Sequence, residues 1–278
     1  MKNNIKGDSF KVAGKFLCKY EIYQGDGNGR VIVLLPAIGV EIRKYETLIE
    51  QLVKEGFQVV TSEMPGYGNS QPKPSRENDY NYSDLLRDYL PAMLDKAIEL
   101  NAKEIPIIFG HSLGGHIATL FACSTDRSFS LFCVATGNVG YKNWQGMGQI
   151  QIITAAVVFN ILTALYGYLP GKKIGFGIRE AKGLMRDWSR TVCTGNYYHV
   201  SAYKGKKNNN LSKAVYICFK GDNWAPLKSS QELARLIPHS EVSEITMDIK
   251  GNPHSAWIKQ PGEIIKIMKI KMLENKND

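Results

Sequence analysis

The segment of this chain best suited to chemistry is residues 110–115, Gly-His-Ser-Leu-Gly-Gly, which directly follows the apolar run 105–109. It fits the pattern G-x-S-x-G, and a helical apolar pattern follows at 117–121. Between a strand and a helix, this pattern places the serine on a sharp, strained turn that needs glycine-sized neighbours two positions away. The spacing therefore predicts that Ser112 is a nucleophile.

A serine hydroxyl is a poor nucleophile at neutral pH, so it needs a base to accept its proton and a third group to orient that base. His254 is the predicted base, because it lies in a turn-rich loop between a strand predicted at 241–247 and a helix that runs to Met272. The other four histidines flank the nucleophile, lie in a predicted insertion or precede the final strand: His111, His116, His199 and His239.

The predicted acid is Asp222, which follows the apolar strand 215–219 through Lys220 and Gly221. An aspartate after a glycine is often only a turn residue. However, its place at a strand end and the order Ser, Asp, His favour a catalytic role. Asp248 and Glu244 are the alternative acids.

Attack on a carbonyl creates an oxyanion, which needs backbone N–H donors already in place. Leu113, the residue after the nucleophile, is the first predicted donor. The second is expected in the loop after the strand 31–35, where the Ile38 amide is the best candidate and Pro36 is excluded because proline has no N–H.

Strand and helix patterns alternate through most of the chain, which predicts an α/β fold with a mostly parallel central sheet and helices on both faces. Strands are expected near 31–35, 57–61, 105–109, 129–135 and 214–219, and helices at 41–54, 83–100 and 114–123. We expect a core in two parts, 1–136 and 211–278, separated by a helical cap or lid insertion at 137–210.

The insertion contains an uncharged stretch at 143–171 whose apolar centre, 150–169, is long enough to span a bilayer. Polar residues such as Gln151 and Asn160 interrupt it, and a buried helix accounts for the composition equally well. A cap helix is the preferred interpretation, while a membrane-surface element and a true span are the alternatives. Aromatic residues of the insertion are expected to pack the cap or to line an apolar substrate pocket, with four candidates for substrate binding: Trp144, Phe159, Tyr166 and Trp188.

Five segments of the chain resemble the α/β-hydrolase fold superfamily: 35–39, 65–70, 110–115, 221–222 and 253–254. The segments 169–177 and 185–188 resemble a bacterial subgroup of predicted hydrolases, whose relatives are often labelled serine-aminopeptidase-like or esterase-like. The chain differs from many members by Pro36-Ala37 in place of His-Gly, and by Glu63 where the turn pattern has aspartate. The resemblance covers nearly the whole length and implies an α/β-hydrolase fold.

Composition limits the partners. The 278 residues carry a net charge of +9, but the basic residues are scattered and no nucleic-acid-binding motif accompanies them, so no nucleic acid is expected. Metal-ligand spacings and phosphate-binding glycine loops are absent from the sequence, which predicts no metal and no cofactor. Residues 1–16 contain four lysines and no apolar segment, and the five cysteines form no C-x-x-C pair, so a cytoplasmic location is expected.

The sequence thus predicts a serine hydrolase that cleaves a carboxylic ester, or a related acyl bond, of a small and partly apolar substrate through an acyl-enzyme. A thioesterase or an acyltransferase could use the same three residues, because fold alone does not settle function. A noncatalytic or membrane-associated module, which contacts a membrane surface through the cap, is the third hypothesis.

Overall fold

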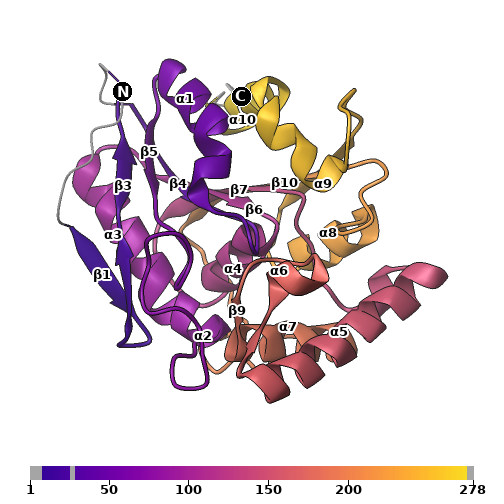
Figure 1. Cartoon of the computed structure of the whole chain (residues 1–278). Helices are drawn as coiled ribbons and strands as arrows, with labels where there is room; N and C mark the ends of the chain where they lie inside the picture. The colour runs from indigo at the N-terminus through magenta and orange to yellow at the C-terminus, as the bar shows by residue number, and fades with distance from the viewer. Residues whose placement is uncertain (1–7, 26–28, 274–278) are drawn as a thin grey trace.

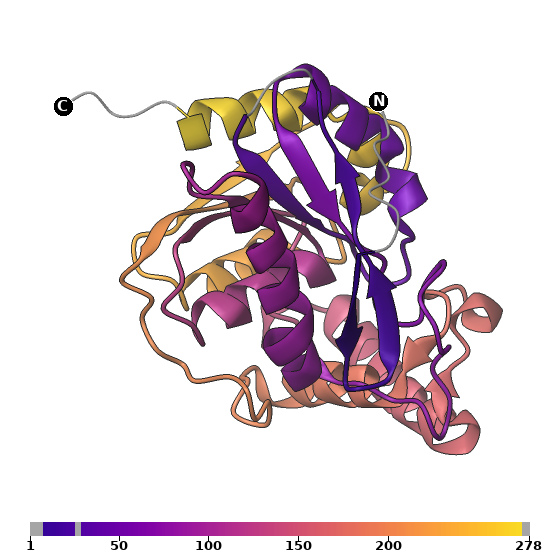
Figure 2. The ribbon, with the colours of Figure 1, turned by 90° about the vertical axis from the view of Figure 1, so that its left-hand side faces the viewer.

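The computed structural model describes residues 8–25 and 29–273 (Figures 1 and 2). Its main sheet has seven strands in the order β11-β10-β7-β6-β4-β5-β3, and every neighbouring pair is parallel except β3 with β5. Its strands are β3 (Glu21–Tyr23), β4 (Val31–Leu35), β5 (Gln58–Thr61), β6 (Ile107–His111), β7 (Phe129–Val134), β10 (Leu211–Phe219) and β11 (Glu241–Ile245). The predicted mostly parallel sheet is confirmed. The N-terminal segment 1–16, which was expected to contain no apolar segment, lies partly outside the described residues.

The strand β4 shows how the sheet divides two apolar cores. Its five residues are all buried, and they alternate between the two sides. Val31, Val33 and Leu35 belong to one core, and Ile32 and Leu34 belong to the other. Successive side chains of a strand point to opposite faces, so a strand covered on both faces must be apolar throughout.

Helices cover both faces of the sheet. The first core includes residues of α3 (Leu90–Leu100), α4 (Leu113–Ala122) and α8 (Leu227–Ala234), whereas the second includes residues of α1 (Glu46–Lys54) and α10 (Gly262–Leu273). Figure 1 shows α1 and α10 together on one side of the strands and α3 and α4 on the other. This arrangement confirms the predicted α/β architecture.

The helix predicted at 83–100 forms in three parts: α2 (Tyr82–Asp84), the π-helical turn η2 (Leu85–Tyr89) and α3. Asn81 caps its start, because its side chain accepts from the Asp84 N–H at 3.2 Å and its own N–H donates to Asp84 Oδ2 at 2.9 Å. Pro91 has no N–H to donate to the preceding turn, and in a regular α-helix its ring would clash with the carbonyl four residues earlier. The wider π-helical turn before it avoids this clash.

The remaining elements surround these layers. A hairpin of β1 (Ser9–Val12) and β2 (Phe16–Lys19) lies apart from the main sheet. Short helical turns lead into α1 and α10: η1 (Ile42–Tyr45), α9 (Pro253–Ala256) and η4 (Trp257–Lys259).

The segment predicted as an insertion follows β7. It contains η3 (Tyr141–Asn143), α5 (Met147–Tyr166), β8 (Tyr168–Leu169), α6 (Gly171–Ile174), β9 (Glu180–Ala181) and α7 (Lys182–Thr194). The long helices α5 and α7 pack side by side at the lower edge of the molecule in Figure 1.

A buried helix, which could have accounted for the composition of 150–169, is not what forms over most of this segment. The segment does form a helix, α5, but only Ala156, Phe159 and Thr163 within it are buried. The physical reason is that α5 packs mainly on α7, so its outer side has no covering element among the described residues. Hydropathy reports how apolar a helix is, and not what covers it.

Candidate active site

Ser112 lies on the sharp turn between β6 and α4, with φ 51° and ψ −115°. This conformation is unusual for a residue with a side chain, and close packing holds it there. A Cβ on Gly110 would lie 2.4 Å from the Gly115 Cα, and one on Gly114 would lie 2.3 Å from the Leu35 carbonyl oxygen. The glycines of the motif are therefore required by the close approach of backbone to backbone.

The structure brings the three predicted side chains together. His254 Nε2 lies 2.9 Å from Ser112 Oγ, and His254 Nδ1 lies 2.8 Å from Asp222 Oδ2. An ionised carboxylate only accepts hydrogen bonds, so with Asp222 ionised Nδ1 carries a proton and neutral His254 leaves Nε2 as the acceptor for the Ser112 hydroxyl. This is the hydrogen-bond order that a serine nucleophile, its base and an orienting acid require.

The parallel strands explain why three distant residues meet. Ser112, Asp222 and His254 follow the carboxyl ends of β6, β10 and β11, which lie at one edge of the sheet. Asp222 is fixed further, because its Oδ1 accepts from the N–H groups of Trp224 at 2.8 Å and Ala225 at 3.1 Å. The Asp222 side chain is fully buried, whereas that of His254 is 15% exposed.

His111, which precedes the nucleophile, contacts the backbone of the predicted base His254. Its Nε2 lies 2.8 Å from the carbonyl oxygen of His254, and its Nδ1 lies 2.7 Å from the Tyr45 hydroxyl. Burial lowers the pKa of His111 to about 3, so the ring is neutral. A carbonyl can only accept, so Nε2 carries the proton and Tyr45 donates to Nδ1.

The loop after β4 presents a single free amide to the site. Ala37 donates its N–H to the Tyr45 hydroxyl at 2.8 Å, and Gly39 donates to the Tyr67 hydroxyl at 3.0 Å. Within residues 8–25 and 29–273, no hydrogen bond occupies the Ile38 N–H. Leu113 is the first residue of α4, so its N–H has no partner within the helix. Both residues line the same cavity as Ser112.

The cavity at Ser112 is small, about 40 Å³. Its walls include Trp188 of α7, Trp224 after β10, and His116 one helical turn beyond Ser112. A water molecule in the liquid occupies about 30 Å³, and a typical ligand site is several hundred. The enclosed space beside Ser112 is therefore much smaller than a typical ligand site.

The four aromatic residues predicted to bind substrate lie at different depths. Trp188 lines the cavity. Phe159 packs behind it, with ring centroids 5.5 Å apart. Trp144 and Tyr166 are not among the lining residues: the Trp144 indole donates to the Asn223 carbonyl at 2.9 Å, and Tyr166 is 47% exposed near Lys173. For these two, residue type alone did not indicate position.

His116 and Trp224 are among the lining residues that the sequence analysis did not assign to the site. His116, which the sequence analysis set aside as a neighbour of the nucleophile, lines the cavity, and its Nε2 has no hydrogen-bond partner in the described part of the chain. Burial lowers the pKa of His116 to about 3, so it is neutral. Trp224 was within reach of sequence reasoning, because it follows Asp222 by two positions at the same strand end.

Glu180, in the segment between β7 and β10, contacts the loop that carries Ile38 through Tyr67. The Tyr67 hydroxyl, which accepts from Gly39, donates to Glu180 Oε2, and Ile178 donates its N–H to Glu180 Oε1 at 2.6 Å. Complete burial raises the pKa of Glu180 from 4.5 to about 8. Between pH 4.5 and about 8, Glu180 is therefore protonated in the folded protein and ionised in the unfolded chain.

The raised pKa of Glu180 predicts that the stability of the protein depends on pH. Between pH 5 and 8, the contribution of Glu180 to the free energy of unfolding falls as pH rises, because the folded state holds more protons there than the unfolded state. Glu180→Gln removes the titration, so wild type should lose stability relative to Glu180→Gln across this range. Urea unfolding of both proteins at pH 5, 6.5 and 8 measures the difference, and a constant difference would contradict the assignment.

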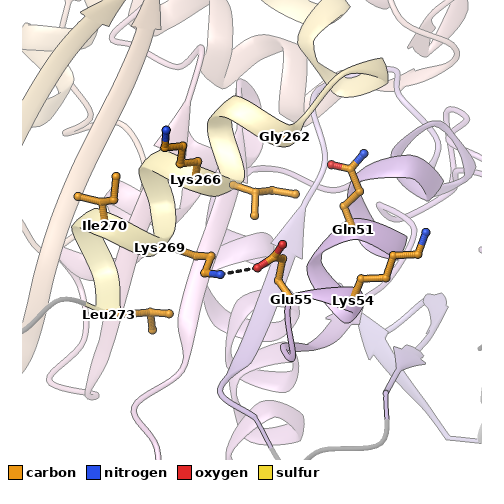
Figure 3. Close-up of a pocket in the computed structure, with 9 residues that line it drawn as sticks. Gln51, Lys54, Glu55, Gly262, Lys266, Lys269, Ile270 and Leu273 are labelled. Atoms are coloured by element: carbon orange, nitrogen blue, oxygen red, sulfur yellow. Dashed lines mark hydrogen bonds and ion pairs between the residues drawn. The ribbon is translucent and has the colours of Figure 1, made fainter.

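A larger groove, about 510 Å³, lies between α1 and α10 (Figure 3). Its wall is formed by Lys54, Lys266 and the ion pair of Glu55 with Lys269, together with aliphatic side chains such as Ile270. It contains no serine, cysteine or histidine, and its one carboxylate, Glu55, is paired with Lys269. Among the described residues, no cluster of three or more His, Cys, Asp or Glu side chains could hold a metal ion.

Comparison with solved structures shows the same fold. The chain superposes on a carboxylesterase structure from the Thaumarchaeon Nitrososphaera gargenis with a TM-score of 0.64 and 17% identity, over 94% of this chain and 96% of that one. A soluble variant of monoglyceride lipase from Saccharomyces cerevisiae gives a TM-score of 0.64 and 12% identity, over 96% of both chains. At these identities the similarity establishes the α/β-hydrolase fold alone.

Sequence comparisons establish the family. Protein ABHD14A of Danio rerio is 30% identical over 92 residues, which is 32% of this chain and 31% of that protein. Residues 28–185, more than half of the chain, match the family described as serine aminopeptidase, S33. The chain belongs to this family and has the α/β-hydrolase fold.

Proposed function

We propose that the protein is a serine hydrolase that cleaves a carboxylic ester of a small, partly apolar substrate through an acyl-enzyme. The observation that carries this proposal is the pair of hydrogen bonds from Ser112 through His254 to Asp222, beside a cavity lined by Ile38 and Leu113. A hydroxyl, a base and two free N–H groups around one cavity are the parts that acyl transfer requires.

In the proposed reaction, Ser112 Oγ attacks the ester carbonyl while His254 Nε2 takes its proton. The N–H groups of Ile38 and Leu113 stabilise the oxyanion, and Asp222 stabilises the imidazolium. His254 then returns the proton to the departing alkoxide, which leaves Ser112 acylated. Water then attacks the acyl carbon while His254 takes a proton from it. The bond from Ser112 Oγ to the acyl carbon breaks as His254 returns that proton to Oγ, which releases the acid.

We assign the segment 137–210 as a cap that selects the substrate. Trp188 of this segment and Trp224 both line the cavity, so a substrate with an apolar acyl part is favoured. Carboxylesterase and monoglyceride lipase are the activities named for two proteins of the same fold. A thioester is the second substrate to test, because the same residues serve its cleavage.

Turnover of p-nitrophenyl esters with acyl chains of two to twelve carbons tests the proposal. We expect hydrolysis with an optimum at short to medium length, because the cavity at Ser112 is small. Adding an alcohol or amine distinguishes hydrolysis from acyl transfer. Hydrolysis gives the free acid, whereas transfer gives a new ester or amide. No turnover of any ester or thioester by purified, folded protein would contradict the proposal.

Tyr45→Phe should weaken both stability and turnover. It removes the acceptor of the Ala37 N–H and the donor to His111 Nδ1, so two buried polar groups lose their partner. We expect a loss of about 1–3 kcal/mol in the free energy of unfolding and a roughly tenfold lower kcat, since a 1.4 kcal/mol rise in the barrier has that effect.

Tyr23→Phe is the matched control, because its hydroxyl lies on an edge strand and bonds only Glu21 in the described structure. It should change the free energy of unfolding by less than about 0.5 kcal/mol. Equal effects of the two substitutions would show that Tyr45 has no special part in positioning the loop and the base.

A further inference from the structure

Helix α5 leaves most of its apolar surface uncovered. It is 20 residues long and has no charged residue, and only Ala156, Phe159 and Thr163 in it are buried. Half of the large hydrophobic side chains that are exposed in the described residues belong to α5. A contiguous run of exposed apolar side chains of this kind is the usual mark of an interaction site.

The exposed side chains form one stripe along α5. Met147, Ile150, Val157, Ile161 and Leu165 recur at intervals of three, seven, four and four residues, which places them on one face of a helix. Each is more than half exposed. At 1.5 Å per residue, the stripe extends about 30 Å.

Both ends of the stripe are positively charged. Exposed lysines precede and follow the helix, Lys142 on one side and Lys172 and Lys173 on the other. No acidic residue occurs from 127 to 179, and the next one, Glu180, is buried. The surroundings of the stripe in the chain are therefore cationic, without acidic residues to balance them.

We propose that α5 docks on the surface of a bilayer that contains anionic phospholipids. An apolar stripe with lysines beside it fits this surface, because the side chains enter the acyl region while the ammonium groups meet the phosphates. A second copy of the chain fits less well, since two such stripes would bring lysines against lysines with no acid from this segment to pair them.

The helix lies on the membrane in this arrangement and does not cross it. The opposite side of α5 packs against α7, where Ala156, Phe159 and Thr163 are buried. The Phe159 ring lies 4.7 Å from that of Phe176 and 5.5 Å from that of Trp188, measured between centroids. A spanning helix would have to abandon this packing.

Docking would also hold the candidate active site beside the lipid. Trp188 lines the cavity at Ser112, and the half-exposed Trp224, which also lines it, contacts Phe176 with ring centroids 5.7 Å apart. An aromatic layer thus connects the inner side of α5 to the cavity wall. The consequence that an apolar ester enters from the bilayer rests on the proposed function, whereas the docking itself does not.

Co-sedimentation with vesicles tests the docking. Wild type should bind vesicles of phosphatidylcholine with 30% phosphatidylglycerol more strongly than vesicles of phosphatidylcholine alone, and salt should weaken the preference. Ser112→Ala should bind as wild type does, so binding is measured independently of any hydrolysis. Absence of binding to either vesicle, or a dimer in solution that excludes vesicles, would overturn the proposal.

Substitutions on the stripe make the test specific. Ile150→Glu combined with Ile161→Glu should weaken vesicle binding at least about tenfold, because each change puts a carboxylate into the apolar contact. The control is Ile270→Glu on α10, which changes an isoleucine of 44% exposure away from the stripe. Thermal unfolding checks that each variant is folded, and equal binding by the stripe variant and the control would overturn the proposal.

A second pair of variants tests the lysines. Lys172→Gln with Lys173→Gln should reduce binding to the anionic vesicles by at least about tenfold at low salt. Lys204→Gln with Lys207→Gln removes the same charge from an exposed loop outside α5 and α6, and should have less effect. If the two pairs lower binding equally, net charge is responsible and the assigned surface is wrong.

Discussion

His254→Ala is expected to lower kcat/KM for a p-nitrophenyl ester by about 10⁴-fold or more, because no other base reaches the serine in the described structure. The Ser112 hydroxyl has one side-chain partner there, His254 Nε2 at 2.9 Å. Without it the hydroxyl keeps its proton during attack, and the leaving group has no proton donor. Initial rates at several ester concentrations separate kcat from KM, and the loss should be in kcat.

His239→Ala is the control for this experiment, since His239 is an exposed histidine in a turn before β11. It should retain the activity of the wild type. Comparable losses in the two variants would remove His254 from the role of base, and retained activity in His254→Ala would move that role to another group.

Asp222→Asn should lower kcat by about 10³- to 10⁴-fold while leaving the fold intact. The amide oxygen of the new side chain can still accept from the N–H groups of Trp224 and Ala225, which turns its NH₂ toward His254 Nδ1. The imidazole must then accept at Nδ1 and carry its proton on Nε2, so it cannot take the proton of Ser112. Kinetics with the same ester measure the loss.

Two other acids near the end of β11 provide the comparison, because either could have been the third member from sequence alone. Asp248→Asn and Glu244→Gln remove exposed carboxylates and should keep turnover within about twofold of wild type. A large loss in either variant with little loss in Asp222→Asn would reassign the acid.

The arrangement of the candidate site could be predicted from the sequence because its parts follow strand ends. Apolar runs marked β4, β6 and β10, and in a parallel sheet the residues after their carboxyl ends share one edge. This placed Ser112 and Asp222 in the same region, and the turn-rich loop after β11 added His254. Their hydrogen bonds follow the predicted order, while their catalytic roles remain for experiment.

The surroundings of the site could not be predicted in the same way. The contact between His111 and the His254 carbonyl joins positions 143 residues apart, and nothing local in the sequence marks it. The links of Tyr45 to Ala37 and of Tyr67 to Glu180 are also tertiary contacts between separate elements. Such contacts depend on how loops cross the sheet edge, which no periodicity encodes.

Helix α5 shows a different limit. Its length and apolar character were evident from the sequence, but a buried helix and a surface helix can share one composition. Polar residues within it, such as Gln151 and Asn160, are exposed together with their apolar neighbours, so the helix has no clean polar face. Only the packing against α7 shows which residues are covered.

Fluorophosphonate labelling tests the central claim most directly, because the probe forms a covalent bond only with a serine whose hydroxyl has been activated. Wild type should gain one label, located on Ser112 by peptide mass spectrometry, and Ser112→Ala should gain none under the same conditions. Labelling of both proteins to the same extent, or of neither while both are folded, would contradict the account.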